Sequence, residues 1–336
     1  MKNLEKNRHG RTSLLVLLTV AAVFLWPTGL AAEDGANPTK QRDIVIGAFR
    51  GPTGVGVAPI IVNGPVVGTY SSLTVELVPE PSVMVGRLAS GEVDIGMVPT
   101  NMAAQLYNRG IPVQIGAVTL WGLLYVVGTD DGISDWSDLG GRKVQALSRG
   151  AGPDIMLRHI LSANGVDPQN DLELDYRYGH IELAQMASAG EVDLAVLPEP
   201  FVTQVLTRRS DMRVVLDFQA AWEDLHGSAY PQTVVLVRRD VAEESPDAVR
   251  EALAAIRAGW DEVTAYPVHG GKLAAEAGMG LPGEVVTAAL PRFNARYVSV
   301  AESKKQLQEY FQILADAEPR SVGGAVPDDG IYLPFR

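Results

Sequence analysis

The feature that most constrains the fold is an eleven-residue segment that the chain contains twice. Residues 91–101 read GEVDIGMVPTN, and residues 190–200 read GEVDLAVLPEP. The dipeptide Arg50-Gly51 recurs at the same offset as Arg149-Gly150. The two copies start at Gly91 and Gly190, 99 residues apart. This period is too long for a solenoid, and two copies are too few for a propeller, so the repeat predicts two similar structural units.

Each unit alternates short apolar segments with segments of helical pattern. In the first unit, residues 44–49, 73–79 and 93–99 have the pattern of strands, and residues 82–92 fit a helix that ends at Gly91. This β–α–β–α–β alternation is typical of a parallel sheet with helices on both faces. We therefore predict an α/β fold of two lobes, each a mainly parallel sheet flanked by helices, with a ligand cleft between them at the carboxyl ends of the strands.

The N-terminus has the order of a secretory signal. A basic start precedes an apolar run at residues 13–26, and small residues follow up to Ala32. The run is shorter than the roughly 20 residues of a membrane span. We expect residues 1–32 to be a signal peptide and the protein to be periplasmic, with an uncleaved anchor as the alternative.

Charge and cysteine content exclude several classes of function. The chain of 336 residues has a formal net charge of −12, which argues against nucleic acid and anionic membranes as partners. It contains no cysteine, so a thiolate nucleophile, a lipidated cysteine and a cysteine-ligated metal are all excluded. The five histidines lack metal-type spacing and no GxSxG motif is present, so we expect neither an enzyme nor a cofactor.

Candidate ligand contacts follow the predicted strands of the first lobe. Gly51-Pro52-Thr53-Gly54 lies where a strand meets a helix, and there the free backbone N–H groups and the helix dipole favour an anion. We expect Thr53 to cap this helix. Thr100 and Asn101 follow the repeated strand and offer polar side chains at its carboxyl end.

The second lobe supplies the matching positions. The turn Ser148-Arg149-Gly150-Ala151-Gly152 adds an arginine that can bind an acidic group with two donors. Glu199 is the last residue but one of the second copy of the repeat and can accept from an ammonium or a ring N–H. Four aromatic residues lie near strand ends or the crossover, where aromatic rings commonly stack on a flat ligand, although each taken singly is expected in the core or at the surface: Trp121, Tyr178, Trp222 and Tyr230.

These features together resemble a known family. The export signal, the paired lobes, the GPTG turn, the two GEVD strands and the stretch LPEPFVT resemble the periplasmic solute-binding proteins of ABC importers, in the nitrate, sulfonate, taurine and thiamine-precursor branch. The resemblance begins near residue 43. It implies a type II binding-protein fold, closure of the lobes over a small ligand, delivery to an ABC permease and ATPase complex, and a monomer without a cofactor.

The resemblance also implies domain limits and a site. The first lobe would comprise residues 43–126 and 233–336, and the second lobe residues 127–232. The ligand contacts would be Gly51, Pro52, Thr53, Gly54, Thr100, Asn101, Trp121, Ser148, Arg149, Gly150, Ala151, Gly152 and Glu199.

Two questions stay open at this point. Arg149 and the two helix starts favour an anionic ligand, whereas Glu199 and the aromatic residues favour a ring that contains nitrogen. Enzymes of the same fold are the alternative function. The one that makes the thiamine pyrimidine depends on a cysteine-rich motif, and the one of menaquinone synthesis acts in the cytoplasm.

Overall fold

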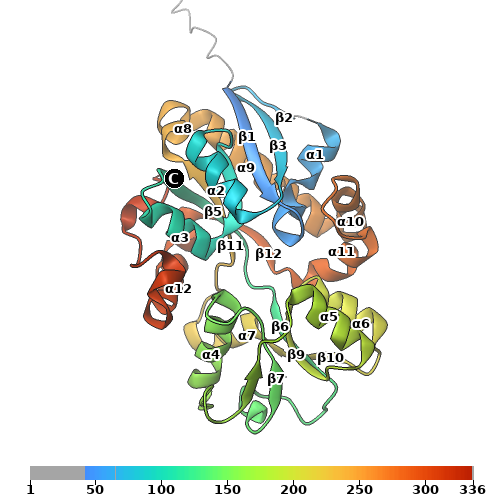
Figure 1. The fold of residues 1–336 in the computed structure, drawn as a ribbon. Coiled ribbons are helices and arrows are strands. Elements are labelled where there is room, and N and C mark those ends of the chain that lie inside the picture. The colour runs from blue at the N-terminus through green and yellow to red at the C-terminus, as the bar shows by residue number, and fades with distance from the viewer. Residues whose placement is uncertain (1–41, 65, 335–336) are drawn as a thin grey trace, which may run out of the picture. The chain divides into compact units, whose positions relative to one another are not determined.

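The computed structural model describes residues 42–64 and 66–334, so the predicted signal peptide lies outside the described residues. Two sheets organise this part of the chain (Figure 1). The larger sheet contains, in spatial order, β12 (Ala295–Ser299), β5 (Val113–Leu120), β11 (Thr233–Arg238), β4 (Ile95–Pro99), β1 (Arg42–Phe49), β3 (Ser71–Val78) and β2 (Val66–Val67). The smaller sheet contains β10 (Arg213–Asp217), β6 (Leu124–Gly128), β9 (Leu194–Pro198), β7 (Lys143–Gln145) and β8 (Glu173–Asp175).

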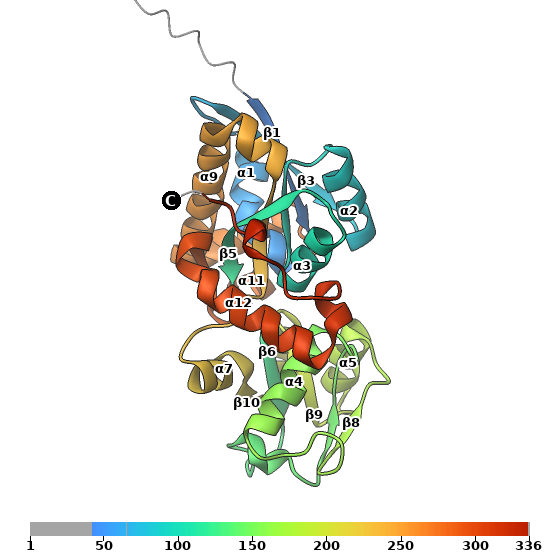
Figure 2. The same ribbon diagram turned by 90° about the vertical axis from the view of Figure 1, so that its left-hand side faces the viewer.

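Helices cover the sheets. The helices next in sequence to the strands of the larger sheet are α1 (Ala58–Asn63), α2 (Pro81–Ser90), α3 (Thr100–Asn108), α8 (Arg239–Glu244), α9 (Pro246–Ala265), α10 (Pro267–Glu276), α11 (Gly283–Ala289) and α12 (Val300–Ala317). Those of the smaller sheet are α4 (Gly152–Ala163), α5 (His180–Ala189), α6 (Phe201–Arg208) and α7 (Phe218–His226). Short 3₁₀ helices are η1 (Pro52–Val57), η2 (Trp136–Leu139), η3 (Leu290–Arg292), η4 (Pro319–Val322) and η5 (Asp329–Ile331). In the larger sheet, α1 and α9 lie on one face, and α2 and α3 on the other (Figure 2).

The repeated segment occupies the same place in both sheets. Gly91 ends α2 and Gly190 ends α5, each with a left-handed backbone conformation, at φ 84° and 85°. A short, largely buried strand follows each glycine, β4 in one sheet and β9 in the other. The spatial orders β3-β1-β4 and β8-β7-β9 also correspond. The prediction of two similar α/β units is therefore confirmed.

The prediction that each sheet is mainly parallel needs correction. Parallel pairing is confined to β1 with β3 and β4, and to β7 with β8 and β9. The other pairings are antiparallel, including β11 with β4 and β6 with β9. The physical reason is that the chain passes from one sheet to the other and back, and the strands by which it enters each sheet, β6 and β11, run opposite to the parallel core.

The chain changes sheets twice. It leaves the larger sheet after β5 and enters the smaller one at β6, and it returns between α7 and β11 (Figure 1). Residues 40–336 form one compact unit, and the predicted lobe limits within it stay predictions. Among the helices of the described part, none combines the length and apolar character that a membrane span requires.

Candidate functional site

The turn after β1 allows close approach of the backbone. Gly51 is the residue before η1 and has φ 91°, and its N–H donates to the carbonyl of Met279 at 2.9 Å. A Cβ on Gly54 would lie 2.4 Å from the carbonyl oxygen of Phe49, so this position requires glycine. The expectation that Thr53 caps η1 is wrong, because the helix starts at Pro52 and the capping position is Gly51, which has no side chain.

The start of α3 leaves hydrogen-bonding groups unsatisfied. In the part of the chain that the structure describes, no side chain caps this helix. Of its first N–H groups, only that of Thr100 has a backbone acceptor outside the helix in this part of the chain, the carbonyl of Gln232 at 3.0 Å. The hydroxyl of Thr100 is buried, and it has no hydrogen-bond partner among the described residues. Asn101 is half-buried, and within the described residues its side chain makes no hydrogen bond. Buried polar groups are nearly always paired, so this helix start is unusual.

The fold brings these two segments together. β1 and β4 are parallel neighbours, so η1 and the start of α3 follow the same ends of adjacent strands. Residues of η1 also contact β4. The predicted residues Gly51, Pro52, Thr53, Gly54, Thr100 and Asn101 therefore lie along one edge of the larger sheet.

The matching turn of the smaller sheet is already occupied by a carboxylate of the chain. The N–H of Gly150 donates to Oδ2 of Asp154 at 2.7 Å. The other oxygen of this buried aspartate accepts from Nε of Arg158 at 2.8 Å and from the hydroxyl of Tyr176. An external anion at the start of α4 would therefore compete with Asp154.

Arg149 remains available for a ligand. Its exposed guanidinium lies over the ring of Tyr176, 5.7 Å from the centroid, and forms no ion pair within the described residues. Arg149 and Gly150 line a cavity of about 1080 Å³ between α4 and the end of α12. Their neighbours Ser148, Ala151 and Gly152 complete the turn, with Ser148 in the left-handed region at φ 53°.

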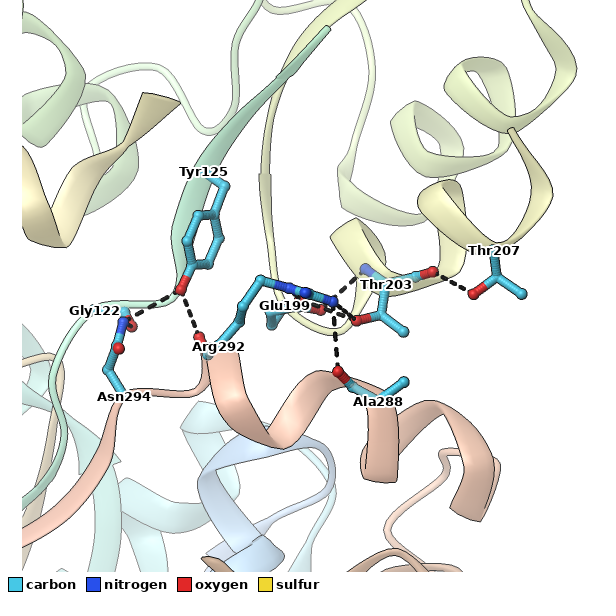
Figure 3. A network of polar contacts seen from close by, with 8 residues as sticks. All are labelled: Gly122, Tyr125, Glu199, Thr203, Thr207, Ala288, Arg292 and Asn294. Atoms are coloured by element: carbon cyan, nitrogen blue, oxygen red, sulfur yellow. Dashed lines mark hydrogen bonds and ion pairs between the residues drawn. The ribbon is translucent and has the colours of Figure 1, made fainter. Parts of the chain in front are cut away.

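Glu199 is bound by the protein itself (Figure 3). Its fully buried carboxylate accepts from Nε of Arg292, and it also accepts the backbone N–H and the hydroxyl of Thr203, at 3.1 and 3.0 Å. Nη2 of Arg292 also donates to the Thr203 hydroxyl at 2.6 Å. The cation next to Glu199 is therefore an arginine 93 residues later in the chain, which no local motif indicates.

The aromatic residues differ in exposure. Trp121 is buried, and its indole N–H donates to the carbonyl of Arg296 at 2.8 Å. Trp222 and Tyr230 are also buried, because their rings pack on each other and on Tyr310. Trp222 and Tyr230 therefore lie in the core, in agreement with the interpretation that the sequence favours for each of them taken singly. Among the described residues, no group of three or more His, Asp or Glu converges as metal ligands do.

Comparison with known proteins places this arrangement in context. The NMT1/THI5-like family matches residues 71–269 of the chain. The nitrate/nitrite binding protein NrtA of Synechococcus elongatus is 24% identical over 262 residues, which are 74% of this chain and 53% of that protein. The chain thus spans about half the length of this relative.

Two solved structures have a similar fold. An ABC transporter structure from Parabacteroides distasonis is 26% identical with a TM-score of 0.75, over 87% of this chain and 99% of that one. The periplasmic aliphatic sulphonate binding protein SsuA of Escherichia coli is 18% identical with a TM-score of 0.66, over 86% of this chain and 96% of that one.

Proposed function

The chain belongs to the NMT1/THI5-like family, and from this premise we propose that it is an exported solute-binding protein that delivers a small anionic solute to an ABC permease. The similar proteins are named for binding nitrate, nitrite or aliphatic sulphonates, all of which are oxyanions. They support the class of ligand as well as the class of protein.

The observation that carries this proposal is the unsatisfied start of α3. The Thr100 hydroxyl is buried without a partner, and the helix has no cap. An unpaired buried hydroxyl costs about 1–3 kcal/mol, and this cost is recovered when a ligand oxygen accepts its proton. A helix N-terminus also favours negative charge. A nitrate, sulfonate or carboxylate oxygen fits both donors, and Gly51–Gly54 would admit it close to the backbone.

In this proposal the second lobe contributes charge and closure. Arg149 would contact the anion from the turn after β7, next to the backbone of Ser148, Ala151 and Gly152, whereas the N–H of Gly150 already donates to Asp154. Trp121 would support the segment that crosses from β5 to β6. The ligand favours closure only to the extent that it binds the closed form more tightly than the open form. No covalent step is required.

For Glu199 we propose a structural role in place of a ligand contact. Because Arg292 and Thr203 already occupy its oxygens, a ligand ammonium would have to displace Arg292. We therefore favour an anion over a ring that contains nitrogen, and we assign Glu199 to holding the end of β9.

A substitution of Thr100 tests the proposal. Replacing the hydroxyl in Thr100→Val keeps the side-chain volume and removes the donor. Purified protein is titrated calorimetrically with nitrate, taurine, alkanesulfonates, carboxylates and pyrimidines. We expect one oxyanion class to bind, and Thr100→Val to weaken it about tenfold to a hundredfold, the value of a hydrogen bond to a charged group. The stability of the ligand-free variant should stay unchanged or rise.

Thr264→Val serves as the matched control. Thr264 lies in α9, and its hydroxyl donates to the carbonyl of Trp260 at 2.8 Å, away from the start of α3. This variant should retain full affinity. Full affinity in Thr100→Val, or binding of a pyrimidine instead of an oxyanion, would contradict the proposal.

A further inference from the structure

Three helices meet at a cluster of titratable side chains. His159 of α4 and His226 of α7 approach each other with their Nε2 atoms 3.0 Å apart. Nδ1 of His226 lies 2.9 Å from Oε1 of Glu309 in α12. Helix α12 follows the last strand of the larger sheet and lies beside α4 of the smaller sheet (Figure 2). The cluster therefore connects elements of both sheets.

The two imidazole rings face each other head-on. Their centroids are 5.2 Å apart, their Nε2 atoms are 3.0 Å apart and their planes differ by 21°. The difference of 2.2 Å is about two ring radii, so both nitrogens lie close to the line that joins the ring centres. This is the geometry of an N–H···N hydrogen bond. Two ligands of one metal ion would instead converge on a third point at a tetrahedral angle.

The hydrogen bonds restrict where protons can reside. The carboxylate of Glu309 accepts a hydrogen bond from the Nδ1–H group of His226, so Nε2 of a neutral His226 has a lone pair. His159 must then carry its proton on Nε2 and donate it. If His226 becomes an imidazolium, it donates to both partners and His159 accepts. When both rings are charged, two N–H groups face each other at 3.0 Å, and the hydrogen bond is lost.

The surroundings offer little compensation for a second proton. The ring centroid of Trp222 lies 4.0 Å from that of His226 and 5.6 Å from that of His159, so an aromatic side chain borders the pair. Burial, and then the charge of His226, lower the pKa of His159 below its ordinary value, whereas the charge of Glu309 acts in the opposite direction.

Two other charged groups on these helices have partners of their own. Arg158 of α4 is bound by Asp154, and Glu223 of α7 accepts from Gln219. Tyr310 of α12 is buried, and burial raises its pKa far above neutral pH. Glu309 is thus the carboxylate that faces the pair directly.

We propose that His159, His226 and Glu309 form a contact that holds α12 to α4 and α7 at neutral pH and opens when both histidines are protonated. The contact is independent of the ligand. Its consequence, that acid eases relative movement of the two sheets and weakens solute binding, rests on the proposed function.

The sign of the pH dependence follows from linkage. Because the pKa of His159 is lower in the folded protein, the unfolded chain binds more protons between this value and the ordinary value of 6.5. The free energy of unfolding is therefore not reduced by His159 above about pH 6.5, and it decreases as the pH falls below this value.

Histidine titration by NMR tests the coupling. The Cε1–H resonances of the purified protein are followed from pH 4.5 to 8 in the wild type, in His226→Gln and in His269→Gln. His159 should titrate below 6.5 in the wild type, and His226→Gln should raise its pKa because the neighbouring charge is removed. His269 pairs with Glu262 elsewhere, so its substitution should leave His159 unchanged. An unchanged pKa of His159 in His226→Gln would overturn the proposal.

Thermal unfolding provides a second readout. In His159→Gln the amide can still donate to Nε2 of His226 but cannot titrate. Its melting temperature should fall less between pH 7 and pH 5 than that of the wild type, whereas that of His269→Gln should fall equally. If the melting temperature falls equally in His159→Gln and in the wild type, the proposed contact is wrong. Ligand-free protein serves for both measurements, so their outcome does not depend on the proposed function.

Discussion

At the scale of single residues, the pairing of Glu199 with Arg292 makes a prediction about stability possible. The carboxylate is fully buried, and about a third of the arginine side chain is exposed. Removal of one partner from a buried ion pair costs about 3–5 kcal/mol, because the other charge remains buried without compensation. Solvent reaches the arginine, so we expect Arg292→Ala to lower the free energy of unfolding by about 2–3 kcal/mol, measured by urea denaturation.

Two further variants separate the ion pair from other effects. Arg296→Ala removes a guanidinium that lies over the ring of Trp121, 5.3 Å from its centroid, without an ion pair within the described residues. It should cost less than 1 kcal/mol. The double variant Glu199→Gln with Arg292→Met should recover part of the loss, since no charge is left buried. Equal destabilisation by Arg292→Ala and Arg296→Ala would show that the pair contributes nothing specific.

At the scale of elements, the two glycines of the repeat form a natural matched pair. Gly91 and Gly190 end their helices with nearly identical φ values, 84° and 85°. A Cβ at Gly190 would meet only Nη1 of Arg209, at 4.0 Å, whereas at Gly91 it would lie 2.2 Å from Nη1 of Arg238. Arg238 in turn binds Asp240.

Substitution by alanine should therefore affect the two helix ends unequally. Gly190→Ala should cost about 1 kcal/mol, the penalty of a left-handed conformation with a side chain. Gly91→Ala should cost about 1 kcal/mol more, because Arg238 must also move. Chemical denaturation of both variants measures the difference. If the two costs are equal, Arg238 moves aside freely.

At the scale of the whole molecule, local patterns could predict the scaffold but not the long-range contacts. The repeat and the strand–helix alternation predicted the corresponding cores of the two sheets, because periodicity and glycine stops are local properties. The pairing of Glu199 with Arg292 joins residues 93 positions apart, and no local pattern encodes it. β12 was missed for a similar reason, since the irregular sequence ARYVS becomes a strand only by pairing with β5. The antiparallel directions of β6 and β11 also depend on long-range pairing, so local patterns did not predict them.

The two similar units differ in the polar groups at the carboxyl ends of their strands, and from this difference we predict how a ligand binds. The start of α3 is unsatisfied, whereas the start of α4 holds Asp154 and the end of β9 is closed by Arg292. A ligand held between the units should thus bind α3 first and Arg149 on closure.

Hydrogen exchange with and without the ligand should show slower exchange both in the first turn of α3 and in residues 148–152. In Arg149→Ala we expect weaker binding and protection of α3 alone. Protection limited to α3 in the wild type would mean that the ligand binds without closure.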